Sequence, residues 1–123
     1  MRIAQIEVTT TGTDGSAAGT AYSTSPLSGE LVAFKVDWDA SAPAGTSDIA
    51  ITSEKSPTIT YYTKDNAATD AWVYPVVQST DNAGGAVADQ YQHYPVVDRL
   101  KVVVAGCNAL DPAVTVYAFV REQ

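Results

Sequence analysis

The stretch ELVAFKVDW, residues 30–38, decides the fold of this chain. Its side chains alternate between apolar and mixed character, and a period of two is typical of a half-buried β-strand. We therefore predict that one face of this strand points into a core and the other points away from it. The core face is made by Val32, Phe34, Val36 and Trp38; the other face is made by Leu31, Ala33, Lys35 and Asp37.

Alternating or short apolar segments recur along the chain, separated by turn-forming residues. Pro75 and Pro95 each interrupt one of these segments, because proline cannot donate to a β-ladder. No long window has a helical period, and no linker divides the chain. The further segments are residues 2–10, 20–24, 47–53, 58–63, 71–78, 90–97, 100–105 and 114–121.

These patterns predict an all-β protein: one antiparallel β-sandwich domain over residues 1–123, jelly-roll-like, with about eight or nine short strands. The length of 123 residues suits a single domain. Val, Thr and Tyr, which favour strands, are abundant, whereas the strong helix formers are scarce. Trp38 and Cys107 are expected to be buried in the core.

The charge balance restricts the possible partners. The chain has 14 acidic and 7 basic residues and a formal charge of -7 at pH 7. Such a surface repels phosphate backbones and anionic lipids, so nucleic acid and membranes are not expected as partners. Cys107 is the only cysteine, which excludes an intrachain disulfide. The first residues have no signal-peptide pattern, so synthesis in the cytoplasm is expected.

A search for catalytic motifs finds none. His93 is the only histidine, so a His-x-x-x-His zinc site is excluded, and there is no Gly-x-Ser-x-Gly elbow and no phosphate-binding loop before a helix. We expect no catalytic residues, no metal, no cofactor and no enzymatic activity.

Two acidic groups have both a functional and a simpler structural interpretation. Asp37 and Asp39 flank Trp38, and paired carboxylates beside an aromatic ring are used by glycosidases. A solvated strand end explains them better in a chain with little material for a cleft. A second group could offer oxygen ligands to calcium, but its spacing does not match an EF-hand loop and an ordinary polar turn is favoured. This group is Asp65, Asn66 and Asp70.

The aromatic residues offer the clearest candidate surface. Tyr and Trp are frequent at protein interfaces, although they also fill sandwich cores. Tyr91 and Tyr94 flank His93 on a proline-interrupted segment, and together with Tyr74 they form the predicted interface set. The alternative is a sugar-stacking platform in a carbohydrate-binding module, made by Trp72, Tyr74, Tyr91 and Tyr94.

Four segments carry a resemblance to a known group of proteins: SGELVAFKVDW at 28–38, SDIAIT at 47–52, AWVYP at 71–75 and DRLKVVV at 98–104. Their order resembles small virion proteins of tailed bacteriophages. The resemblance implies a β-sandwich or jelly-roll fold and a structural role in the virion. Fold class, size, acidity and the lack of catalytic motifs make a head decoration (cement) protein the leading hypothesis. Such a protein would bind the major capsid protein or other virion proteins on the capsid exterior as a homo-oligomer, with a trimer favoured. A minor capsid, neck, tail or fibre component is the second reading.

Overall fold

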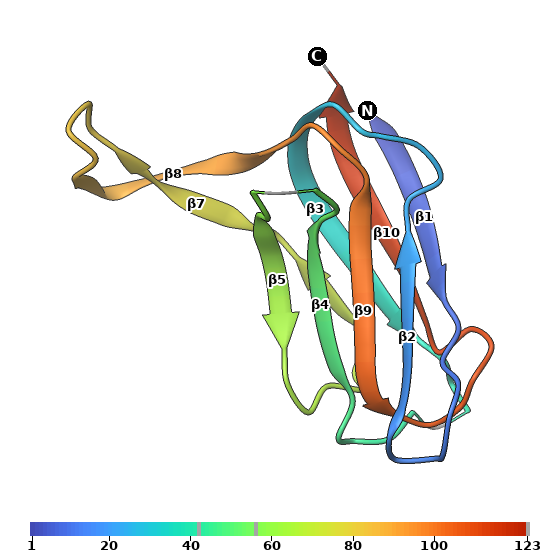
Figure 1. Ribbon diagram of the computed structural model, residues 1–123. Coiled ribbons are helices and arrows are strands. Elements are labelled where there is room, and N and C mark those ends of the chain that lie inside the picture. The colour runs from blue at the N-terminus through green and yellow to red at the C-terminus, as the bar shows by residue number, and fades with distance from the viewer. Residues whose placement is uncertain (42, 56, 123) are drawn as a thin grey trace.

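Ten antiparallel strands in two sheets make up the part of the chain that the computed structural model describes, residues 1–41, 43–55 and 57–122 (Figure 1). The predicted all-β sandwich is confirmed, with ten strands where eight or nine were expected; the jelly-roll connectivity stays a prediction. The described residues include no helix that is long and apolar enough to cross a membrane. The strands are β1 (Arg2–Val8), β2 (Ala17–Tyr22), β3 (Gly29–Trp38), β4 (Asp48–Ser53), β5 (Thr60–Lys64), β6 (Ala71–Val73), β7 (Val76–Thr80), β8 (Ala86–Val96), β9 (Leu100–Cys107) and β10 (Val114–Glu122).

The two sheets pack face to face around one core. The large sheet has the order β1-β10-β3-β8-β7, and β6 also pairs with β3; the small sheet has the order β2-β9-β4-β5. Phe34 and Val116 fill the core from the large sheet, and Ile51 and Val102 fill it from the small sheet, all fully buried or nearly so. Buried aliphatic and aromatic surface of this kind is the main source of stability in a sandwich.

The alternation on β10 predicted its buried face correctly. Val114, Val116, Ala118 and Val120 are all buried. The predicted burial of Trp38 is confirmed at 6% exposure, as is that of Cys107, whose free thiol is fully enclosed. β10 pairs with β1 without a register shift, and the extra residue in its pairing with β3 lies on β3, so β10 keeps its own period of two.

On β3 the predicted inward and outward faces are wrong for Leu31 and Val32, the two residues before Ala33. Leu31 pairs with Val120 and Ala33 with Phe119, so Val32 is an extra residue without a partner on β10. This β-bulge reverses the alternation. Leu31 therefore enters the core with no exposed surface, and Val32, expected in the core, is only partly buried.

The two prolines behave differently. Pro75 separates β6, which pairs with β3, from β7, which pairs with β8, so the predicted break is confirmed. The break predicted at Pro95 is wrong: β8 runs through it, and Pro95 lies opposite Glu30 of β3. Pairing with β7 has already ended at His93, so β8 has a neighbour on one side only and tolerates a residue without an N–H.

From the Val76–His93 pair to the tip, β7 and β8 project from the sandwich as a two-stranded hairpin (Figure 1). We call this hairpin, residues 76–93, the β7–β8 arm. The predicted loop tip between the strands is a compact turn. One carboxylate oxygen of Asp81, Oδ1, accepts hydrogen bonds from the N–H groups of Ala83 at 2.9 Å and Gly85 at 2.8 Å. The arm therefore has an organised tip although it has no core of its own.

Candidate protein-docking surface

The outer face of the large sheet carries a row of apolar and aromatic side chains. Residues paired across antiparallel strands point to the same face. Phe119 lies between Ile3 of β1 and Ala33 of β3, while Lys35 of β3 pairs with Trp72 of β6. We call this surface the aromatic face; it comprises Ile3, Trp72, Tyr74, Tyr117 and Phe119.

The rings of the aromatic face contact one another. The Trp72 and Phe119 ring centroids are 5.5 Å apart, and those of Trp72 and Tyr74 are 6.4 Å apart with their planes 15° from parallel. The ammonium nitrogen of Lys35 lies 5.6 Å from the centre of the Trp72 ring, within range of a cation–π interaction. Trp72 is thus held in a defined position by three neighbours.

This face remains strongly exposed to solvent. Trp72 is 53% exposed and Tyr74 is 66% exposed. All the exposed large hydrophobic residues except Tyr22 lie on, or directly beside, strands of the large sheet. They are Met1, Ile3, Trp72, Tyr74, Val76, Tyr91 and Val97. Exposed apolar residues gathered on one sheet mark a binding surface, whereas scattered ones do not.

The β7–β8 arm extends this apolar character away from the sandwich. Val76 pairs with His93 and Gln78 pairs with Tyr91, so the four side chains share one face of the hairpin. Val76 and Tyr91 are 46% and 60% exposed. The arm therefore presents two exposed apolar side chains, Val76 and Tyr91, on one of its faces.

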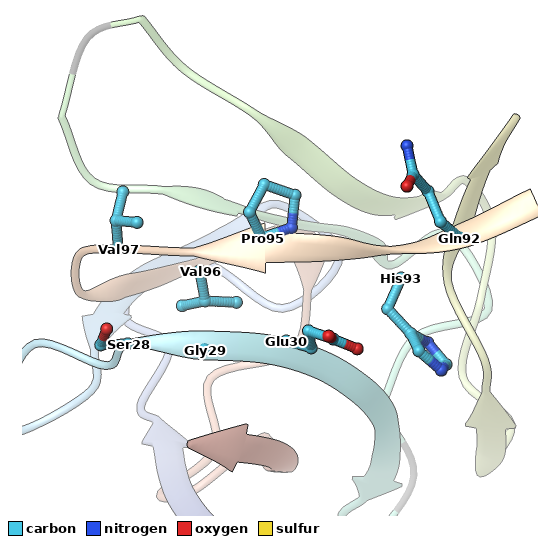
Figure 2. Close-up of a pocket in the computed structure, with 8 residues that line it drawn as sticks. All are labelled: Ser28, Gly29, Glu30, Gln92, His93, Pro95, Val96 and Val97. Carbon is cyan, nitrogen blue, oxygen red and sulfur yellow. The ribbon is translucent and has the colours of Figure 1, made fainter. Parts of the chain in front are cut away.

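His93 lies at the base of the arm, beside a shallow pocket of about 540 Å³ between the start of β3 and the end of β8 (Figure 2). In this view His93 and Val96 project from β8 toward β3, whereas Gln92 and Pro95 project to the other side. The Nδ1 atom of His93 is buried and has no hydrogen-bond partner in the part of the chain that is described.

The carboxylate in the same pocket is occupied elsewhere. Glu30 Oε2 accepts a hydrogen bond from Arg121 at 3.4 Å, in an ion pair at the solvent-exposed end of β10. The pocket thus offers an unpaired imidazole nitrogen and an already paired carboxylate.

Tyr94 faces the core. Its ring packs edge-to-face against Tyr61, with centroids 5.4 Å apart, and the Tyr61 hydroxyl donates a hydrogen bond to the carbonyl of Pro95 at 3.2 Å. Burial, and then the charge of Asp98, raise the pKa of Tyr61 to about 12. These two tyrosines join the end of β8 to β5 of the small sheet.

The structure therefore distributes the predicted interface set over three places. Tyr74 belongs to the aromatic face, Tyr91 to the arm, His93 to the pocket and Tyr94 to the contact with Tyr61. Of the four rings proposed as a sugar platform, only those of Trp72 and Tyr74 stack on each other within the described residues. Sequence reasoning missed Ile3 and Phe119, although each is an apolar residue on the outward phase of an alternating strand.

In each of the two acidic groups, one carboxylate accepts a backbone hydrogen bond. Asp39 Oδ1 accepts a hydrogen bond from the N–H of Ser41 at 2.6 Å, and Asp70 Oδ1 accepts one from the N–H of Trp38 at 2.7 Å. Asn66 has a φ of 53° and donates its N–H to Asp48, as expected in a polar turn. Over residues 1–41, 43–55 and 57–122 no three His, Cys, Asp or Glu side chains are grouped to hold a metal ion.

Comparison with known proteins adds no relative. No family model matches the chain, and neither the curated proteins nor the solved structures include a match. The fold and the surface together define the class: a β-sandwich with an exposed aromatic face and a projecting hairpin arm.

Proposed function

We propose that this chain is a non-catalytic structural subunit of a virion, a head decoration (cement) protein that binds the exterior of a bacteriophage capsid as a homo-oligomer. The observation that carries the proposal is the exposed aromatic face, whose most exposed rings are those of Trp72 and Tyr74. A surface of this kind is suited to protein partners, because interfaces are enriched in aromatic residues that anchor in a partner's pockets.

The extent of the apolar surface fits a protein interface. An aromatic side chain buries roughly 150–250 Å². The exposed parts of three aromatic and four other apolar side chains therefore amount to several hundred Å²; these residues are Trp72, Tyr74, Tyr91, Met1, Ile3, Val76 and Val97. A standard interface buries about 800 Å² on each partner, including a polar rim. The aromatic face and its surroundings are large enough to supply one side of such an interface.

The charge of the chain is compatible with the proposed location. A formal charge of -7 disfavours contact with packaged DNA and is no obstacle on the outside of a shell. Many copies, each bound with modest energy, would stabilise the shell collectively, because linked contacts act in parallel.

The proposal is tested by co-sedimentation of the purified chain with emptied heads of the phage that encodes it. We expect saturable binding, and we expect the double variant Trp72→Ala/Tyr74→Ala to bind at least about tenfold more weakly. Tyr22→Ala is the matched control, because Tyr22 is exposed on the small sheet beneath Arg99. Equal loss in both variants, or no binding by the unaltered chain, would contradict the proposal.

A neck, tail or fibre position is the second structural candidate. The same aromatic face would serve there, so the distinction depends on location. Electron microscopy of particles carrying gold-labelled chain separates the two: label over the faceted head supports decoration, whereas label at the tail or its junction supports the alternative.

A carbohydrate-binding module is the third candidate, favoured by the nearly parallel, exposed rings of Trp72 and Tyr74. Against it, Lys35 already lies over the Trp72 ring, where a sugar would have to stack. A glycan array decides between these readings, because specific binding that Trp72→Ala abolishes would support the sugar-binding function.

A further inference from the structure

The β7–β8 arm is a structural element that its own chain does not complete. Two-stranded hairpins are marginally stable in water, and three or more strands are needed for independent stability. The arm has two strands, and its pairing with the sandwich is confined to Tyr94–Val96 against β3. The two outer edges of the arm face no other strand in the described part of the chain.

The two edges differ in how well they could accept another strand. β8 has a large bulge: its four residues 87–90 lie opposite a single residue of β7, Ser79. Asp89, within the bulge, has a φ of 60°. A bulge and a charge are the features by which natural sheets block edge pairing. β7 has neither proline nor charge between Val76 and Thr80, so its edge is unprotected.

The charge distribution permits a second copy of the chain at the β7 edge. Each chain carries a formal charge of -7, so two copies repel each other over most of their surfaces. The sequence VVQST of β7 is neutral, and the nearby carboxylate of Asp81 is engaged by the turn at the tip. Two copies can therefore approach along β7 without placing like charges opposite each other.

We infer that β7 pairs antiparallel with β7 of a second copy, joining two arms into one four-stranded sheet. The contact is isologous, since each copy contributes the same strand. Other edges are less suited. The β8 edge is bulged, β5 ends in the charged Lys64, β1 carries Arg2 and Glu7, and Ala18 of β2 already pairs with Thr11. The arms project from the sandwiches, which leaves room for both bodies (Figure 1).

The merged sheet would gather apolar surface from both copies. Val76 and Tyr91 share a face of each arm, so pairing places four such side chains on a common surface. Main-chain hydrogen bonds along five-residue strands supply the affinity, as in other cases of β-strand addition. Such a contact is smaller than a standard interface, and we expect a reversible dimer in the micromolar range.

The first test is the mass of the purified full chain by light scattering over a range of concentrations. We expect a concentration-dependent dimer. Ser79→Lys, which places a positive charge on β7 of each copy, should weaken it at least about tenfold. Ala88→Lys on β8 is the matched control and should leave the dimer unchanged. A monomer at every concentration, a trimer, or equal effects of the two variants would overturn the inference.

Cysteine cross-linking keeps the inference testable if Ser79→Lys fails to fold. Cys107 is buried, so a single new cysteine on the arm reports alone. We expect Val77→Cys, Gln78→Cys or Ser79→Cys to form a covalent dimer under mild oxidation, according to which lies at the two-fold axis. Ala88→Cys should not; absence of cross-linking at all three β7 positions refutes the pairing.

This inference does not depend on the virion role. If the purified chain stays monomeric but binds phage heads, the capsid-binding role stands, whereas the β7 pairing fails. If it dimerises through β7 but binds no head, the β7 pairing stands and the proposed function fails.

Discussion

The rings of Trp72 and Phe119 meet above β3, the strand that lies between their own strands β6 and β10, with 5.5 Å between the ring centroids. Both strands pair with β3, where Ala33 is only 4% exposed although it is on the outer face. A small residue at this position lets the two large rings approach each other. The aromatic face is thus a consequence of strand order as much as of composition.

This contact should be measurable as a coupling between the two residues. In a double-mutant cycle with Trp72→Ala and Phe119→Ala, we expect a coupling free energy of about 0.5–1.5 kcal/mol, the usual range for an aromatic pair. Urea denaturation of the four proteins measures it. A cycle of Tyr22→Ala with Phe119→Ala is the control and should be additive, because Tyr22 lies on the other sheet.

The bulge in β3 predicts opposite consequences for two neighbouring residues. Leu31→Ala should lower the free energy of unfolding by about 2–5 kcal/mol, because Leu31 is fully buried and its removal leaves a cavity. Val32→Ala should cost about 1 kcal/mol or less, because Val32 lies outside the core cluster. Guanidinium unfolding curves compare the two, and a larger loss at Val32 would show that the strand keeps the regular alternation.

The same bulge shows what the sequence could predict. Alternation identifies the strands and the buried side of β10, since side-chain burial depends only on a period of two. It predicts Phe34, Val36 and Trp38 correctly because these follow the bulge. A bulge depends on the register with a partner strand, and an isolated pattern contains no information on register.

The candidate surface was only partly predictable for a related reason. Tyr74 and Tyr91 are exposed, but Tyr94 turns inward to Tyr61, and its burial is set by a strand far away in the sequence. Likewise Trp72 and Phe119 become neighbours only through β3. The number and type of aromatic residues indicate a binding surface, whereas the strand order decides which of them form it.

An ion pair on the small-sheet side should make stability depend on acid. Arg99 donates charge-assisted hydrogen bonds to both carboxylate oxygens of Glu54, and this contact lowers the pKa of Glu54 below 4.5. The stabilisation is present above pH 4.5 and is lost as the pH falls through the lowered pKa. We expect Glu54→Gln to lower Tm slightly at pH 7, and the difference from the unaltered chain to shrink on acidification.

Thermal melts at several pH values check this, and added salt provides the control. The pair is accessible to solvent, so salt should reduce the difference at pH 7 as well. A Tm difference that is constant from neutral to acidic pH would contradict a role for the ionised Glu54 carboxylate.

Tyr61 should make the protein less stable at high pH, whereas the Glu54 pair loses its stabilising effect at low pH. Its pKa is raised from 10.0 to about 12, chiefly by burial, so the folded state holds the phenolic proton more tightly than the unfolded state does. The resulting stabilisation is complete below pH 10 and is lost as the pH rises toward 12, by on the order of 2 kcal/mol. Tyr61→Phe should remove this part of the loss of stability at high pH. Ultraviolet titration of the variant should also lack the phenol that ionises at about pH 12.

The same variant tests how the arm is attached to the sandwich. The Tyr61 hydroxyl bonds to the carbonyl of Pro95, at the base of the β7–β8 arm, so Tyr61→Phe should cost about 1 kcal/mol even at pH 7. Hydrogen exchange of the backbone amides locates the effect. Faster exchange in β8 near Tyr94, with β1 and β10 unchanged, is expected if Tyr61 anchors the arm, whereas a uniform increase would mean that the variant only weakens the whole sandwich.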